Sequence, residues 1–335
     1  SCFASAEIIV EVIALPSATI SGDATICEGS TATITFSGTP NTEVTFTLDG
    51  GANQVVTLDA SGNATWTTPP LTSDAVIDLV SVSTTGPTPC SQSLTGTVNI
   101  TVVPLPTGSI SGTTTICENQ SATITFSGTA NATITYTVNG GANQTIVLDA
   151  SGSGSVSTGP LTADVIYDLV SVASAGTPTC TQTISGNATV TVGSLPTANI
   201  SGDTTICPGS AAIILFSGTP GGVVTYTVNS GANQTVTLDA AGNANVTTPA
   251  LFADTTYNLV SVEIPGTPPC SQNVTGSVLI EIDNLPVASI SGDTTICPGS
   301  TATIDFTGTA NATVTYTVDG GANQTITLDA SGNGS

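Results

Sequence analysis

Residues 31–49 read TATITFSGTPNTEVTFTLD, and apolar side chains alternate with small polar ones through both halves of this stretch. In the first half Ile34 and Phe36 fall on one side of an extended chain, and in the second half Val44 and Phe46 do the same. A period of two residues is typical of β-strands with one buried face, and the intervening SGTPN is typical of a turn. The stretch therefore predicts two strands that each bury one face.

The same alternation continues on both sides, through a block of about 90 residues. Further strands are predicted at residues 17–27 (broken near Gly22), 54–59, 64–68, 75–83 and 94–103. The segments DGGAN and DASGN between strands are hairpin signals, with Gly at positions that favour positive φ. About seven short strands without a helical pattern predict an all-β fold, an immunoglobulin-like (Ig-like) β-sandwich.

This block recurs every 90 residues. The markers are Leu-Pro pairs at 15, 105, 195 and 285, cysteines at 27, 117, 207 and 297, and cysteines at 90, 180 and 270. We divide the chain into the last strand of a preceding repeat (1–14), repeat 1 (15–104), repeat 2 (105–194), repeat 3 (195–284) and partial repeat 4 (285–335). Short proline-containing links predict an elongated, semi-rigid rod. Because half a sandwich cannot bury its inner face, we expect the natural chain to be longer.

The composition excludes several functions. The 335 residues include no Lys, Arg or His and 23 acidic residues, for a net charge of −23. Nucleic-acid binding needs cations that displace counterions from phosphate, so it is excluded. The longest apolar run, residues 8–16, contains Glu11 and is too short to insert into a membrane. Without His or Lys, and with glutamates that do not recur between repeats, we expect no enzyme.

The segment ISGDTTICPGS at 290–300, followed by TVTYTVDGGANQTITLDASG at 313–332, resembles tandem Ig-like or PKD-like repeats. Such repeats occur in very large surface proteins of Bacteroidota, including gliding-motility adhesins exported by type IX secretion. The resemblance covers essentially the whole chain. It implies an extracellular, cell-surface stalk whose partners are further copies of the same repeat and whose tip ligand is unknown. Two alternatives stay open: repeats that polymerise laterally into a filament or sheath, and repeats that bind glycans themselves.

The eight cysteines predict disulfides in an oxidising compartment, because the chain has neither CxxC pairs nor histidine for zinc. Pairing within a repeat would join Cys27 to Cys90. In the Ig strand order, Cys27 precedes the second strand and Cys90 follows the sixth, which runs in the same direction. An eight-residue strand spans roughly 25 Å, whereas the Cα atoms of a disulfide lie within about 7 Å. Pairing within a repeat stays the alternative if the strand order differs.

Pairing between consecutive repeats is the favoured prediction. Where one end of a repeat meets the opposite end of the next, Cys27 comes near Cys180 and Cys117 comes near Cys270. The other cysteines would then pair with copies outside this sequence: Cys2, Cys90, Cys207 and Cys297. Each bond closes a loop of more than ~100 residues, worth up to roughly 5 kcal/mol. Such bonds would stiffen the links between repeats.

Two sets of aspartates recur, and we interpret both as residues that hydrogen-bond turn backbone. Asp59, Asp149, Asp239 and Asp329 open the DASGN-type turn, and Asp74, Asp164 and Asp254 precede the sixth strand. Neither a cofactor nor a metal site is predicted. The alternative is weak Ca²⁺ binding at repeat junctions, through Asp23 or Asp283-Asn284.

The resemblance to Bacteroidota proteins has one further implication, for modification. Asp-Thr-Thr occurs at 203–205, 254–256 and 293–295 and resembles the O-glycosylation signal of that phylum. The resemblance implies sugar on Thr204, Thr255 and Thr294.

Overall fold

The computed structural model describes residue 8 and residues 12–335, and its regular secondary structure there is entirely strand. Most of the strand predicted at 1–14, and Cys2 with it, lies outside the described residues. The chain divides into two compact units, residues 1–192 and 193–335. The first unit contains repeats 1 and 2, and the second contains repeat 3 and partial repeat 4.

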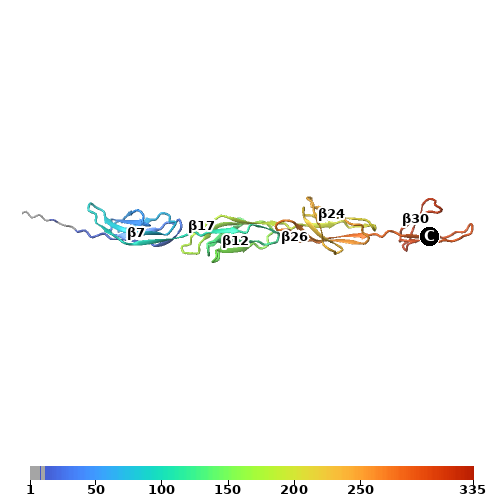
Figure 1. The fold of residues 1–335 in the computed structure, drawn as a ribbon, viewed down its shortest axis with the longest axis horizontal. Helices are drawn as coiled ribbons and strands as arrows, with labels where there is room; N and C mark the ends of the chain where they lie inside the picture. Colours follow the sequence, from blue (N-terminus) through green and yellow to red (C-terminus); the bar gives the residue numbers. More distant parts are fainter. Residues whose placement is uncertain (1–7, 9–11) are drawn as a thin grey trace, which may run out of the picture. The chain divides into compact units, whose positions relative to one another are not determined.

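Repeat 1 folds into two sheets (Figure 1). Its strands are β1 (Ala18–Ser21), β2 (Ala24–Cys27), β3 (Thr33–Gly38), β4 (Thr42–Leu48), β5 (Gln54–Thr57), β6 (Asn63–Thr67), β7 (Ala75–Thr84), β8 (Ser91–Ser93) and β9 (Thr97–Val103). One sheet has the order β1-β3-β6, and the other has the order β2-β9-β7-β4-β5, with β8 paired to β7. Two facing sheets with this order form an Ig-like sandwich, so the predicted fold class is confirmed.

Repeats 2 and 3 have the same strand order. Repeat 2 contains β10 (Gly108–Ser111), β11 (Thr114–Cys117), β12 (Thr123–Gly128), β13 (Thr133–Val138), β14 (Gln144–Val147), β15 (Ser153–Ser157), β16 (Val165–Ala173), β17 (Thr181–Thr183) and β18 (Asn187–Gly193). Repeat 3 contains β19 (Ala198–Ser201), β20 (Thr204–Ile206), β21 (Ile213–Gly218), β22 (Val223–Val228), β23 (Gln234–Thr237), β24 (Asn243–Thr247), β25 (Thr255–Ile264), β26 (Cys270–Asn273) and β27 (Ser277–Ile282).

The first strand of each repeat crosses from one sheet to the other. In repeat 1, β1 pairs antiparallel with β3, whereas β2 pairs parallel with β9. Gly22 lies at the crossing with a φ of 135°, and a Cβ added there would lie 2.8 Å from the Thr33 carbonyl oxygen. The crossing therefore requires glycine. This break, together with the short strand β8, is why nine strands are seen in residues 15–104 where about seven were predicted.

Each complete repeat has its own core. In repeat 1, Ile34, Phe36 and Phe46 are fully buried. The Phe46 ring lies 4.9 Å from the Phe36 ring and 5.0 Å from the Trp66 ring, measured between centroids. These are the inward positions of the alternating pattern, so the pattern identified the core correctly. Tyrosine replaces Phe46 at the same position in repeats 2 and 3, as Tyr136 and Tyr226.

The strands of partial repeat 4 pair less extensively than those of the complete repeats. Its strands are β28 (Ala288–Ser291), β29 (Asp305–Gly308), β30 (Thr313–Tyr316), β31 (Gln324–Thr327) and β32 (Asn333–Gly334). Residues 294–297 form no strand there, because residues 285–335 include no counterpart of β9 for them to pair with. Ile304 is 41% exposed, whereas Ile34 at the same position in repeat 1 is 0% exposed.

Candidate functional site, the disulfide junction

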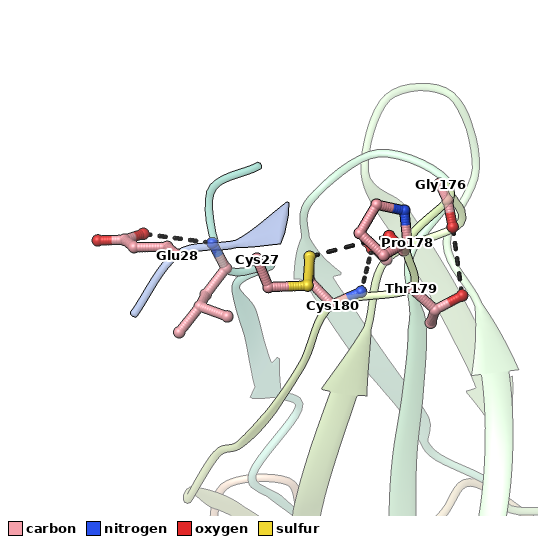
Figure 2. Close-up of a disulfide and its surroundings, with 8 residues drawn as sticks. Cys27, Glu28, Gly176, Pro178, Thr179 and Cys180 are labelled. Atoms are coloured by element: carbon pink, nitrogen blue, oxygen red, sulfur yellow. Dashed lines mark hydrogen bonds between the residues drawn. A yellow bond between two sulfur atoms is a disulfide. The ribbon is translucent and has the colours of Figure 1, made fainter. Parts of the chain in front are cut away.

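A disulfide joins repeat 1 to repeat 2, between Cys27 and Cys180 (Figure 2). The two Cα atoms are 5.5 Å apart and the residues are separated by 153 positions in sequence. This is the pair that the strand order favoured over Cys27–Cys90.

Cys27 is early in the sequence of repeat 1 but lies at the end of its sandwich where the last strand, β9, finishes. It is the last residue of β2, and its register partner across the parallel ladder is Val103, the last residue of β9. The Glu28 N–H also donates to the Val103 carbonyl, at 2.9 Å. Because β2 and β9 run in the same direction and end together, Cys27 is held beside the segment that leads into repeat 2.

In the sandwich of repeat 2, Cys180 lies at the end where β18 begins, opposite the end where β18 finishes. It follows β16, which is antiparallel to β18. Two hydrogen bonds close the loop at its base: the Ser174 N–H donates to the Cys180 carbonyl, and the Cys180 N–H donates to Ser174 Oγ, both at 2.9 Å. The Thr179 hydroxyl donates to the Gly176 carbonyl within the loop (Figure 2). The sulfur is therefore presented by a backbone fixed at several points.

The linker between β9 and β10, residues 104–107, is hydrogen-bonded to both repeats. The Leu105 N–H donates to the Glu28 carboxylate at 3.4 Å, which connects the linker to repeat 1 (Figure 2). The Gln182 side chain, two residues after Cys180, donates to the Pro106 carbonyl and connects the linker to repeat 2. The disulfide and these two hydrogen bonds hold the linker between the ends of two sandwiches.

Sequence reasoning missed both linker contacts. A signal for the second was present, because glutamine follows two residues after the cysteine in each of the three complete repeats, as Gln92, Gln182 and Gln272. The contact itself recurs in repeat 3, where the Gln272 side chain donates to the Pro196 carbonyl. The contact of Glu28 was harder to predict, because glutamate does not recur at this position in all repeats: repeat 3 has Pro208 there.

The other cysteines that the structure describes fall into two groups. Cys117 and Cys270 are both disulfide-bonded. Their bond with each other stays a prediction. Cys90, Cys207 and Cys297 are free thiols within the part of the chain that the structure describes. Partners for them in further repeats likewise remain predicted.

The aspartates of the DASGN-type turn bind turn backbone, as predicted. Asp59 Oδ1 accepts the N–H groups of Ser61 and Asn63, at 2.8 and 3.0 Å. Asp149, Asp239 and Asp329 make the same pair of contacts. A hydrogen bond from the Ser151 hydroxyl lowers the pKa of Asp149, and backbone N–H donors lower the pKa of Asp329. These carboxylates are structural.

The second set of aspartates requires a correction. Asp74 accepts the N–H of Val102, in the last strand of repeat 1, at 2.6 Å. Asp164 and Asp254 accept from Val192 and Ile282 in the same way. The prediction of turn backbone as their partner was wrong, because the start of the sixth strand lies beside the last strand, and the carboxylate accepts an N–H of that strand.

The residues proposed for weak Ca²⁺ binding have other contacts. Asp23 accepts the N–H of Asn99 at 2.7 Å, close to the strand crossing at Gly22. At Asp283 the contact is made by the backbone N–H, which donates to the Ile206 carbonyl, and does not involve the carboxylate. Over residues 12–335, we find no group of three or more His, Cys, Asp or Glu side chains that could hold a metal ion.

The three threonines implied as glycosylation sites differ in accessibility. Thr204 and Thr294 are exposed. Thr255 is only 6% exposed, and its hydroxyl donates to the Ala253 carbonyl at 3.0 Å. The folded repeat leaves no space for a sugar at Thr255, so that prediction is corrected. Sugar on Thr204 and Thr294 stays a prediction.

Comparison with known proteins adds little to this description. No family model and no curated protein matches the chain. A marsupial T cell receptor is 11% identical with a TM-score of 0.37, over 78% of this chain and 100% of that one. An ICAM-5 D1–D4 ectodomain fragment is 11% identical with a TM-score of 0.35, over 94% and 99% of the two chains. Elastase-activated α2-macroglobulin of Escherichia coli has a TM-score of 0.23 at 11% identity, over 92% of this chain and 35% of that one.

All three TM-scores are below 0.5, so the fold assignment rests on the sheet order described above. The described residues contain no helix long and apolar enough to span a bilayer. The chain is thus a series of Ig-like repeats with a disulfide that crosses from one repeat to the next.

Proposed function

We propose that this chain is part of the stalk of an extracellular, cell-surface adhesin-like protein, stiffened by disulfides between consecutive repeats. The class of protein is that of the giant Bacteroidota surface adhesins of the gliding-motility type, exported by type IX secretion. The stalk holds an adhesive or motile tip away from the cell, and no catalysis is assigned to it.

The Cys27–Cys180 bond carries this proposal. Repeats 1 and 2 each have a core of their own, and the disulfide joins the two sandwiches outside both cores. What it restricts is the movement of one repeat against the other at a short linker. Disulfides persist in oxidising compartments, which supports a location outside the cytoplasm.

The surface composition also supports the proposal. With no Lys and no Arg in 335 residues, the chain has no site for trypsin-like proteases. Its outward strand positions carry mostly Thr and Ser, as at Thr33 and Thr35, and the net charge of −23 disfavours close association of stalks. These properties suit a stalk exposed to the medium.

The proposal is tested by surface shaving of intact cells of the source bacterium. Antibody against a purified repeat is expected to label unpermeabilised cells. A chymotrypsin-like protease, which cleaves after Phe, Tyr and Leu, is expected to remove the label. Trypsin is the matched control: it cleaves other surface proteins but cannot cut within these 335 residues, so any labelled fragment that it releases should contain them intact. Labelling that requires permeabilised cells would contradict the proposal.

A further inference from the structure

The disulfide changes which residues carry tension through the first unit. Residues 28–179 lie inside the loop that the Cys27–Cys180 bond closes. A pull applied before β1 and after β18 therefore has a shorter covalent route than the backbone. It follows residues 18–27, crosses the two sulfur atoms, and continues along residues 180–193.

This route is already close to its maximum length. It consists of β1 and β2 in repeat 1, then β17 and β18 in repeat 2, with only short breaks between paired strands. Strand residues already rise about 3.2–3.4 Å each, and a fully stretched chain reaches about 3.3–3.6 Å per residue. Stretching the route further therefore gains very little length.

Most of both cores lies off this route. In an Ig-like repeat without such a bond, tension enters by the first strand and leaves by the last. The parallel ladder between β2 and β9 would then be loaded in shear, because the two strands would be pulled in opposite directions. With the bond in place, β9 is inside the closed loop, and so are β10 and β11 at the start of repeat 2.

We infer that the Cys27–Cys180 disulfide is a force bypass: it carries tension around residues 28–179, so that repeats 1 and 2 cannot lengthen by unfolding while the bond is intact. The inference rests on the proposed stalk function for the tension it describes. It goes beyond stiffening of the linker, because it assigns to the bond a limit on extension and not only on bending.

The test stretches the full chain in optical tweezers through handles at its two termini. The other six cysteines are replaced by serine (C2S, C90S, C117S, C207S, C270S and C297S), so that Cys27–Cys180 is the one remaining disulfide. The comparison chain carries C27S and C180S in addition. Residues 28–179 correspond to about 500–550 Å of stretched chain at ~3.3–3.6 Å per residue.

We expect the fully unfolded oxidised chain to be shorter than the comparison chain by this length. Adding dithiothreitol to the stretched oxidised chain should then release the missing length in one step. Its thiolate attacks one sulfur atom, forms a mixed disulfide and displaces the other cysteine as a thiolate. This second measurement compares one oxidised molecule before and after reduction, so it holds even if the comparison chain folds poorly.

Equal lengths of the two chains, or no release on reduction, would overturn the inference. The measurement uses purified protein, so it does not depend on where the cell places the chain. Failure of surface labelling with a normal bypass would overturn the proposed function alone.

Discussion

The loop that carries Cys180 in repeat 2 and the loop that carries Cys90 in repeat 1 are closed by the same two hydrogen bonds, but only one of the two cysteines is disulfide-bonded. In repeat 1 the Thr84 N–H donates to the Cys90 carbonyl, and the Cys90 N–H donates to Thr84 Oγ1, both at 2.9 Å. Ser174 makes the same two bonds with Cys180, at the same distances. Yet Cys180 is fully buried in a disulfide, whereas Cys90 is half-buried and free.

The difference teaches that the loop presents its cysteine independently of the bond. Repeat 1 holds Cys90 in place with backbone and hydroxyl contacts of its own, although the thiol is free. At the other end of the sandwich, Cys27 is bonded while Cys207, at the same position in repeat 3, is exposed and free. Breaking or transplanting features of the bonded junction should therefore affect only the repeats it joins.

The largest effect is expected from removing the bond. The C27S/C180S variant should lose about 3–5 kcal/mol of stability, because a loop closed over 153 positions no longer restricts the unfolded chain. Repeat 1 can be followed alone through Trp66, the single tryptophan, which packs against Phe46. Urea unfolding monitored by its fluorescence should shift to lower urea.

The matched control for that measurement is Cys207→Ser, which removes a free, exposed thiol at the same position of another repeat. It should leave the Trp66 transition unchanged. Equal shifts in both variants would show that the effect comes from losing a cysteine and not from losing the bond.

The next effect depends on pH and separates repeat 1 from repeat 2. Burial raises the pKa of Tyr136, and burial together with the nearby Tyr136 raises that of Tyr167. The folded form thus favours the neutral phenols, so their contribution to stability is complete below pH ~10 and is lost as pH rises through the folded pKa. Repeat 1 has Phe46 and Ile77 at these positions.

Hydrogen exchange at rising pH, corrected for the intrinsic rate, should therefore show repeat 2 opening before repeat 1. Replacing both residues by phenylalanine (Y136F/Y167F) removes the ionisable groups and should abolish the difference. Opening of both repeats at the same pH, with or without these substitutions, would show that the phenols are not the cause.

A smaller effect is expected at the linker. Gln182→Ala removes the donor to the Pro106 carbonyl and should cost about 1–2 kcal/mol, because this carbonyl is then left without that hydrogen bond. Exchange of the amides in β17 should become faster. Thr181→Ala, an exposed neighbour in the same strand, is the control and should change little. No difference between the two variants would show that the linker is held by the disulfide alone.

The smallest effect concerns the outer face of repeat 3. Ile213 and Leu215 are 55% and 49% exposed, where repeats 1 and 2 have threonine. The double variant I213T/L215T should change stability by no more than about 0.5 kcal/mol, as is usual for surface positions. Thermal unfolding of the full chain would measure it. A loss several times larger would mean that this face is covered in solution.

Much of this fold could be predicted from local pattern, because alternation with a period of two marks the buried face directly. Ile34, Phe36 and Phe46 were placed in the core for this reason, and they are fully buried. The strand crossing was visible only as a break at Gly22, since the sheet that β2 joins is decided by its distant partner β9. The same limit explains Asp74, whose partner Val102 lies 28 positions away.

The junction was only partly predictable. Strand direction sufficed to place Cys27 and Cys180 at facing ends, because that depends on strand order and not on side-chain detail. The linker contacts of Glu28 and Gln182 depend on where two side chains meet a few backbone atoms of residues 103–106. No periodicity encodes such contacts. The burial of Thr255 could not be predicted either, because the threonines at the same position of the other two Asp-Thr-Thr motifs, Thr204 and Thr294, are exposed.

Peptide mapping under non-reducing conditions tests the central claim most directly. The native chain, with free thiols blocked, is digested with a chymotrypsin-like protease, and disulfide-linked peptides are identified by mass spectrometry. The bond between repeats predicts a linked pair that contains Cys27 and Cys180 and that separates on reduction. A linked pair that contains Cys27 and Cys90 would contradict it.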